Sequence, residues 1–328
     1  MHILTTTPLS YYLTPMLDDQ VIHAEEEKKL REELVIRQRA QGAEHPATLA
    51  IRNNLAHALR SQGKFAEAEK EHREVLASFQ RVLGAEHPDT LASRNNLANG
   101  LYAQRKYAEA EEEYGKVLAA CRNVFSAKQP INFTTRYNLA AALFAQRKHA
   151  EAEKEYREVI AIHQRDPCAD NPITLASQNN LATVLYAQGK YAEAEEEHRG
   201  VIAILRRVLG AEHPDTLSSR NRLAITLLAQ GKYAEAEKEH REVLTIRQRA
   251  LGTEHPELFQ SYHNLAAALI AEGKLEEALK VSRFSEDGFK RAFGKDNPDY
   301  KIALRLRESI ETALWQKEQD KRRREDLY

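Results

Sequence analysis

The sequence is poor in the residues that cross-link a chain or carry redox chemistry. Only two of its 328 residues are cysteines, Cys121 and Cys168, and no CxxC pair occurs. This usage excludes a disulfide framework and suits a reducing compartment, so we expect a cytoplasmic protein. Both thiols are expected to be buried as small apolar residues and not to act as nucleophiles.

Signatures of catalysis and cofactor binding are also missing. The sequence contains no GxSxG, Walker loop, GxGxxG, HExxH or EF-hand loop. We therefore expect no catalytic residue, no metal site and no cofactor, and the protein is predicted not to be an enzyme. Lys plus Arg (48) nearly balances Asp plus Glu (49), which gives no reason to expect nucleic-acid binding.

The start of the chain lacks the features of a targeting or membrane-spanning segment. It has no basic region and is interrupted by Pro8 and Pro15, so it predicts neither a signal peptide nor a spanning helix. Residues 1–21 are nevertheless apolar, and we expect them to form a deformed capping helix or to contact something outside the molecule. Weak membrane contact is one option for Tyr11, Tyr12 and Leu13.

A strict internal repeat organises the rest of the sequence. Two amphipathic segments joined by a short turn such as Gly-Lys lie in each period, which predicts a helical hairpin. The turn glycine is expected to end the first helix, and a Gly-x-Glu-His-Pro loop to end the second. Prolines recur 42 residues apart at Pro46, Pro88, Pro130, Pro172, Pro214, Pro256 and Pro298.

These repeats resemble the tetratricopeptide repeat, because Leu97, Ala98, Tyr107, Ala110 and Tyr114 stand at that family's signature spacings. The 42-residue period, the NNLA of the first helix, the GKYAEAE of the turn and the GxEHP loop are similar to kinesin light chains, and especially to stand-alone bacterial kinesin-light-chain-like proteins. Arginine replaces the family's usual Trp, as in kinesin light chains, at Arg52, Arg94, Arg136 and Arg220.

The resemblance implies an all-α fold, a right-handed α-solenoid of 42-residue tetratricopeptide-type hairpins. We expect this superhelix to occupy residues 22–315 as one domain, beginning with the second helix of a truncated repeat. A charged tail, residues 316–328, is expected to follow the last helix.

One first-helix position carries asparagine in five repeats and arginine in a sixth. The resemblance implies that this position lies on the concave face and hydrogen-bonds the backbone of an extended peptide. A structural role, with each asparagine bonded to a neighbouring helix turn, is the alternative. The residues are Asn54, Asn96, Asn138, Asn180, Arg222 and Asn264.

Further side chains on the same face are expected to line the groove. Aromatic residues in its middle and polar residues at its ends suit a peptide or helix ligand. The alternative interpretation places the aromatic residues in the core. These candidates are Asn95, Asn99, Tyr102, Tyr137, Phe144, Asn179, Tyr186 and Asn221.

The histidines are expected to be structural, because they recur one per repeat and lie too far apart to share a metal ion. One set precedes the repeat prolines: His45, His87, His213 and His255. A second set occupies one second-helix position, where Tyr114 and Tyr156 appear in other repeats: His72, His198 and His240.

These features predict a non-enzymatic adaptor or scaffold that binds a protein or peptide. Some bacterial kinesin-light-chain-like proteins accompany bacterial tubulins, so the resemblance implies tubulin-like filament subunits as partners. The apolar start or a basic end would tether such a filament to a membrane, the basic end being Arg322, Arg323 and Arg324. A peptide-sensing regulator and a scaffold for a multiprotein complex are the alternatives.

Overall fold

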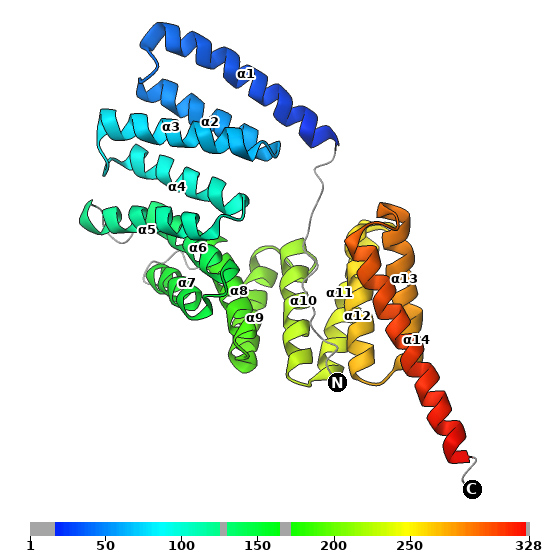
Figure 1. Cartoon of the computed structure of the whole chain (residues 1–328). Helices are drawn as coiled ribbons and strands as arrows, with labels where there is room; N and C mark the ends of the chain where they lie inside the picture. The colour runs from blue at the N-terminus through cyan, green and yellow to red at the C-terminus, as the bar shows by residue number, and fades with distance from the viewer. Residues whose placement is uncertain (1–16, 125–129, 165–171, 326–328) are drawn as a thin grey trace. The chain divides into compact units, whose positions relative to one another are not determined.

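The computed structural model describes residues 17–124, 130–164 and 172–325, which are helical apart from short turns (Figure 1). Most of segment 1–21, including Tyr11, Tyr12 and Leu13, lies outside these ranges, as does Cys168. Within them no strand occurs, and no helix is long and apolar enough to cross a lipid bilayer. The helices are α1 (Leu17–Gln41), α2 (Pro46–Ser61), α3 (Phe65–Leu83), α4 (Pro88–Ala103), α5 (Tyr107–Val124), α6 (Pro130–Ala145), α7 (His149–Gln164), α8 (Pro172–Ala187), α9 (Tyr191–Val208), α10 (Pro214–Ala229), α11 (Tyr233–Leu251), α12 (Pro256–Ala271), α13 (Leu275–Phe293) and α14 (Pro298–Glu325).

The repeat prolines mark helix starts, which confirms the all-α hairpin fold predicted from the 42-residue period. Each even-numbered helix begins at a repeat proline and is the first helix of its repeat. Odd-numbered helices from α3 onward are the second helices, and α1 is a second-type helix without a described first helix. The described residues fall into two compact stacks, an N-terminal unit that ends at Val184 and a C-terminal unit that begins at Leu185.

The GxEHP loop is a helix start in which almost every residue has a role. Gly84 takes φ +93°, which a side chain would disfavour, and His87 is the N-cap of α4, its Nδ1 accepting from the backbone N–H of Asp89 at 3.2 Å. Pro88 follows at the first helical position. Thr90 Oγ1 then donates to the Gly84 carbonyl at 2.7 Å, which closes the loop.

The glutamate of the same loop joins neighbouring repeats. Glu254 pairs with Arg291 of the following second helix at 3.3 Å, and Glu44 and Glu212 make the equivalent pairs with Arg81 and Arg249. These pairs are exposed, so each contributes at most about 1 kcal/mol. The loop therefore serves both helix capping and repeat stacking.

The turn inside each hairpin follows the predicted glycine C-cap. Gly63 has φ +77°, and the Lys64 N–H donates to the Leu59 carbonyl at 2.9 Å, which satisfies a free carbonyl at the end of α2. Two repeats depart from this rule, because Arg105 and Arg147 occupy the glycine position with φ values of +62° and +64°. Non-glycine residues rarely adopt this backbone conformation.

Ion pairs occupy the place of the family's tryptophan between the two helices of a hairpin. Arg94 Nη1 lies 2.6 Å from Glu113 Oε2, and both side chains are mostly buried. Arg52 makes equivalent contacts to Glu71 and Glu74, at 2.7 and 2.6 Å. A guanidinium can bridge two carboxylates at once, so it joins the helices where an aromatic ring would pack.

A second network connects neighbouring repeats within each unit. Glu69 of α3 accepts from Gln104 Nε2 at 2.8 Å and from Lys106 Nζ at 2.7 Å, both in the turn of the next repeat. Burial opposes ionisation of Glu69, but Lys106, Gln104 and Arg73 outweigh it and lower its pKa to about 2. Glu27, Glu111 and Glu195 accept the matching pairs of bonds.

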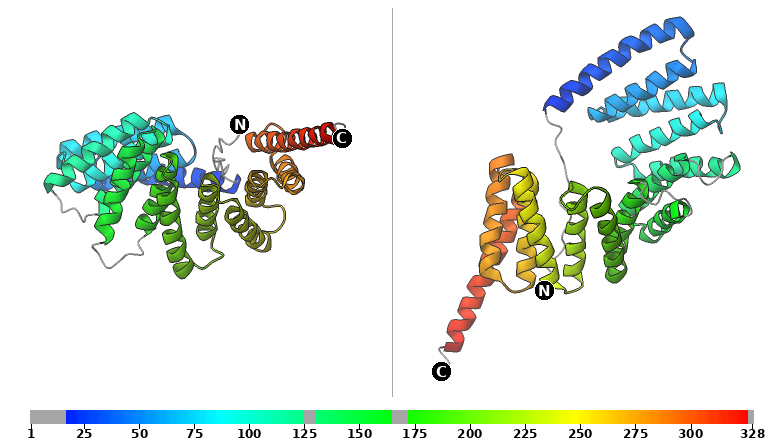
Figure 2. Two further views of the ribbon diagram at one scale, coloured as in Figure 1. Left: turned by 90° about the horizontal axis from the view of Figure 1, so that it is seen from below. Right: turned by 180° about the vertical axis from the view of Figure 1, so that it is seen from behind.

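The last helix carries charge where earlier first helices are apolar. Leu265 and Leu269 of α12 are buried, whereas the residues 42 positions later in α14 are Arg307 and Glu311, which pair at 2.6 Å. Both residues also pair with α13, Arg307 with Glu286 and Glu311 with Arg283, so ion pairs replace apolar packing at this point of the stack. α14 runs through residue 315 without a break and projects beyond α12 and α13 (Figure 2).

Candidate functional site

The first helices of neighbouring repeats touch one another and present a continuous surface within each unit. α2 contacts α4 and α4 contacts α6 in the N-terminal unit, and α10 contacts α12 in the C-terminal unit. We call this surface the first-helix face. Its central row holds the exposed Asn54 and Arg222 and the half-buried Asn96, Asn138, Asn180 and Asn264.

Hydrogen bonds cross this face from one repeat to the next. Asn138 Nδ2 of α6 donates to Asn99 Oδ1 of α4 at 2.9 Å, and the same oxygen accepts from Tyr114 OH at 2.6 Å. Tyr114 belongs to α5 and is buried, and burial raises its pKa, so its hydroxyl stays protonated as the donor. Three helices are thereby tied together at Asn99.

The next pair of repeats in the N-terminal unit uses the same arrangement with a different acceptor. Asn180 Nδ2 of α8 donates to Tyr137 OH at 3.1 Å and to Tyr156 OH at 3.2 Å. Beside this row, Thr135 Oγ1 donates to Asn95 Oδ1 at 3.2 Å, and Asn95 is buried. Asn138 and Asn180 are therefore each hydrogen-bonded to the repeat before their own.

The asparagine of the first repeat is not held by hydrogen bonds of this kind. His57 is hydrogen-bonded to Asn96, and burial, reinforced by the nearby Arg60, lowers the pKa of His57 below its ordinary value of 6.5. Asn54 is exposed and forms no side-chain hydrogen bond with any described residue. This end of the row thus holds an unengaged amide.

In the C-terminal unit one asparagine uses both ends of its amide inside the fold. Asn264 Nδ2 donates to Asn221 Oδ1 at 3.0 Å, and Asn264 Oδ1 accepts from Gln260 at 2.8 Å. Arg222 of α10 is exposed on the same face. The row therefore differs in chemistry between the two units.

The sequence profile of the tetratricopeptide repeat matches six overlapping stretches, 27–81, 48–123, 92–165, 132–199, 173–249 and 219–291. The chain belongs to the tetratricopeptide repeat family. No curated protein matches the sequence.

Solved structures refine this assignment. A Podosopora anserina protein described as a kinesin light chain with nearly identical TPR-like repeats is 31% identical, with 63% of this chain and 97% of that chain covered and a TM-score of 0.59. BtubC (BKLC) from P. vanneervenii is 18% identical over 76% of this chain and 90% of its own, with a TM-score of 0.54. A Rap protein complexed with Competence and Sporulation Factor is 12% identical over 90% and 88%, with a TM-score of 0.51. The two low identities show a common fold alone, whereas the first supports a tetratricopeptide repeat protein of the kinesin light chain type.

The asparagine row of this tetratricopeptide repeat protein has a structural function in the stack. Bonds such as Asn138 to Asn99 join the first helices of neighbouring repeats, which is the alternative that the sequence left open. A primary amide has two N–H groups and one carbonyl, so a single bond to the next repeat leaves capacity for a ligand. Peptide binding by this row stays a prediction.

The sequence did not predict that two buried tyrosines of the second helices form hydrogen bonds with asparagines of the first-helix face. Tyr114 and Tyr156 were expected to be packing residues, and they are buried, but their hydroxyls bond Asn99 and Asn180. In α3, where histidine occupies that position, His72 bonds Asn53 at 3.3 Å. The exchange of Tyr for His, both of which carry polar tips, was the signal available in the sequence.

Three of the four predicted groove aromatics lie near the hairpin turns and are not fully buried, whereas Tyr137 lies within α6 and its ring contacts the buried Tyr156 at 5.9 Å. Tyr102 is 37% exposed, and its ring packs on Tyr107 at 5.3 Å. Phe144 and His149 form the equivalent pair at 5.3 Å, and Tyr186 and Tyr191 at 5.4 Å. The near-identical ring geometry in three repeats shows that this aromatic pair is a regular part of the hairpin turn.

The histidines have structural positions, and no metal-binding group of three His, Cys, Asp or Glu residues comes together in the described part of the chain. His45, His213 and His255 cap their helices as His87 does. Burial lowers the pKa of His72 and His198 to about 4, so both are neutral at ordinary pH. Cys121 is buried, which raises the pKa of its thiol.

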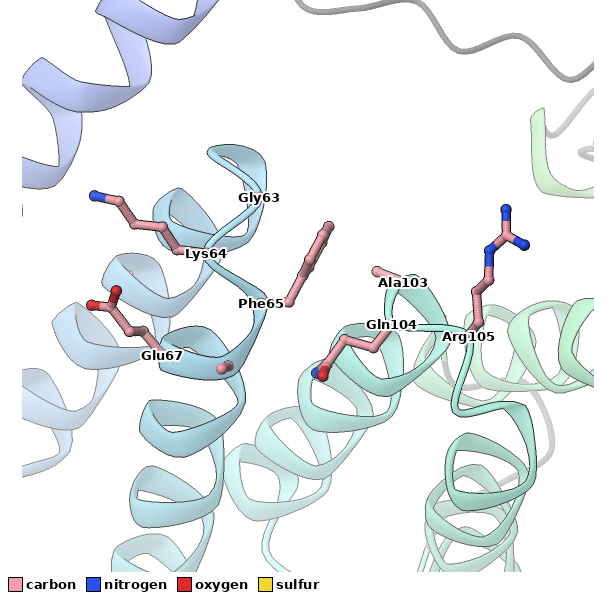
Figure 3. Close-up of a pocket in the computed structure, with 8 residues that line it drawn as sticks. Gly63, Lys64, Phe65, Glu67, Ala103, Gln104 and Arg105 are labelled. Atoms are coloured by element: carbon pink, nitrogen blue, oxygen red, sulfur yellow. The ribbon is translucent and has the colours of Figure 1, made fainter. Parts of the chain in front are cut away.

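A hollow of about 580 Å³ lies beside the first two hairpin turns of the N-terminal unit. Figure 3 shows Phe65 standing between the turn at Gly63 and the turn at Arg105, with Ala103 across from its ring. Lys64, Glu67 and Gln104 complete the lining together with Ala66. This hollow is open and lies outside the polar row, so a small-molecule substrate site is not indicated.

Proposed function

We propose that this protein is a non-enzymatic adaptor that holds an extended segment of a partner protein on the first-helix face of its N-terminal unit. One observation carries the proposal: Asn138 and Asn180, one repeat apart on successive first helices, are each held by a hydrogen bond to the preceding repeat, as Asn138 is to Asn99. Extended peptides are recognised through regularly placed main-chain hydrogen bonds. Groups that are already held in place lose little entropy on binding.

The chemistry of the row suggests which residues bind. The side-chain amides of Asn138 and Asn180 each donate to the preceding repeat. These hydrogen bonds orient the carbonyl oxygen of each amide. Asn54 contributes an exposed amide at the end of the row. We assign these three residues the role of primary contacts and give Asn99 and Tyr137 the role of fixing Asn138 and Asn180.

For the partner, we propose a tubulin-type filament. Support comes from the resemblance to stand-alone bacterial kinesin-light-chain-like proteins, some of which accompany bacterial tubulins, and from the fold shared with BtubC. A regular row of contacts also suits a partner that is itself a repeating polymer. A peptide-sensing regulator is the second candidate, because the fold is also that of the Rap protein complexed with Competence and Sporulation Factor.

The test compares variants that separate binding from folding. Asn54→Ala with Asn138→Ala should abolish binding at a modest cost in stability, about 1 kcal/mol for the lost bond from Asn138 to Asn99. Asn264→Ala is the matched control, because its amide is used within the C-terminal unit and its loss should lower stability without affecting binding.

Binding is read by pull-down from native cytosol with mass spectrometry, followed by co-sedimentation with the recovered polymer. Recovery of a tubulin-like protein that is lost only in the double variant supports the proposal. Recovery of a receptor or enzyme refutes the filament, and binding that survives in the double variant moves the site off this face. A large ligand-dependent change in small-angle scattering would favour the regulator.

A further inference from the structure

The edge formed by the hairpin turns has a surface that the proposed adaptor function does not use. Along it, aromatic side chains at the hairpin turns, which we call ridges, alternate with exposed alanines between neighbouring turns, which we call floors. Tyr102 and Tyr107 form one ridge, and Phe65, which is 38% exposed, stands alone in the preceding repeat. Such exposed aromatic residues next to pockets are the usual anchors of protein interfaces.

The floor between the first two ridges is the hollow of Figure 3. Ala66 and Ala103 are exposed at its base, and Arg105 stands at its far wall. The next junction repeats the same residue types, since exposed Ala108, Ala145 and Arg147 occupy the equivalent positions 42 residues later. Two successive junctions of the N-terminal unit thus combine small residues with an arginine.

Both arginines replace the glycine that other turns use. Arg105 and Arg147 hold φ near +60°, a conformation that glycine adopts without cost, whereas the first turn keeps Gly63. Both side chains are exposed. The same left-handed backbone and exposed arginine therefore recur in adjacent repeats.

Carboxylates follow the ridges with the same period. Glu67 lies two residues after Phe65 and is 62% exposed, and Glu109 lies two residues after Tyr107 and is 54% exposed. Their partners within the chain are distant, Arg31 at 3.8 Å and Arg73 at 3.5 Å. The edge therefore offers two ridges with an acid and two alanine floors with a base.

We propose that this edge binds a second copy of the chain around a two-fold axis. The two ridges of one copy enter the two floors of the other, so that Phe65 and Glu67 meet the floor beside Arg147 of the second copy. Tyr102, Tyr107 and Glu109 meet the floor beside Arg105 of the second copy.

The self-complementary pattern favours a second copy of the chain as the binding partner. A second copy has the same 42-residue spacing, so one fitted contact brings the next into register, and a two-fold axis makes every contact occur twice. It also reverses the order of the repeats, which brings Glu67 of the first ridge opposite Arg147. Charge complementarity of this kind fixes the register of an interface.

Sedimentation equilibrium of the full chain tests the proposal. The wild type should have twice the 37.4 kDa mass of one chain at high concentration and dissociate on dilution. Glu67→Arg and Arg147→Glu should each raise the dissociation constant by roughly tenfold or more, because each opposes like charges twice per dimer. Combining both substitutions should restore dimerisation to near the wild-type value.

Glu235→Arg is the matched control. Glu235 has the same repeat position in α11, is 57% exposed and lies 3.3 Å from Arg199, so its replacement introduces the same charge outside the proposed edge and should leave the dimer intact. Circular dichroism verifies that all variants keep their helices. A wild type that is monomeric at every concentration overturns the proposal, and so does a dimer unaffected by the single charge reversals. Loss of a different protein from the same variants in a pull-down would assign the edge to that partner and also overturn it.

Discussion

Replacing Glu272 by glutamine should stabilise the protein. Glu272 occupies the turn position that holds glutamine in the other hairpins, where Gln230 Nε2, for example, donates to Glu195 at 2.7 Å. An ionised glutamate cannot donate, and Glu272 instead faces the buried Glu237 carboxylate, with Lys274 Nζ lying 2.8 Å from both. The sixth repeat therefore places two carboxyl groups together where its relatives pair an amide with a carboxylate.

The size of the effect follows from the groups involved. A hydrogen bond to a charged acceptor contributes about 1.5–3 kcal/mol to the free energy of unfolding. The contact of Lys274 with Glu272 is half-exposed, so its loss costs at most about 1 kcal/mol. We therefore expect Glu272→Gln to raise the free energy of unfolding by about 1–2 kcal/mol at neutral pH.

Urea unfolding followed by far-UV circular dichroism measures this change, and native-state hydrogen exchange at the turn between α12 and α13 localises it. The reciprocal variant Gln230→Glu should lower stability by a similar amount in the repeat before. An unchanged or lowered midpoint for Glu272→Gln at neutral pH would refute the account of this network.

Three further outcomes are expected. Gly288→Ala should cost about 1–3 kcal/mol of stability despite better helix propensity, because the added Cβ meets the Phe259 ring, and Phe259→Leu in the same chain should restore the thermal midpoint. His87→Ala should lose about 1 kcal/mol in urea unfolding by removing the cap of α4, whereas His87→Asn should retain it, since Asn297 caps α14 in this way. Stability should fall as the pH drops from about 6.5 toward 4, by up to about 1.4 kcal/mol per pH unit for each buried histidine, since unfolding then takes up a proton at an imidazole that burial keeps neutral. Urea midpoints independent of pH in this window would contradict that linkage. Burial lowers the pKa of the imidazole from 6.5 to about 4 at His72, His198 and His263, and to about 3 at His240.

The recurring prolines and glycines allowed the hairpins to be predicted closely. Proline at the first helical position and glycine at the C-cap are local backbone effects that need no knowledge of distant contacts, so helices begin at Pro88 and end near Gly63 as expected. The same holds for the structural assignment of His87, since a side chain one residue before a helix can cap it locally.

The candidate site was less predictable because its contacts cross repeats. A period of 42 residues shows that Asn96, Asn138 and Asn180 share a face, but not that Asn138 bonds Asn99 of the preceding first helix or that Asn180 bonds Tyr137. Those bonds depend on the angle and offset at which one hairpin packs on the next, and side-chain packing across the whole interface sets both.

The sequence by itself therefore determined the family, the hairpins and the chemical content of each face, because these depend on spacing along the chain. Only the tertiary structure decided which polar groups are used by the fold and which stay exposed. Asn54 and Asn264 occupy the same repeat position, yet one is exposed and the other is bonded at both ends of its amide. The difference arises from their neighbours in the adjacent repeat, which a helix pattern does not specify.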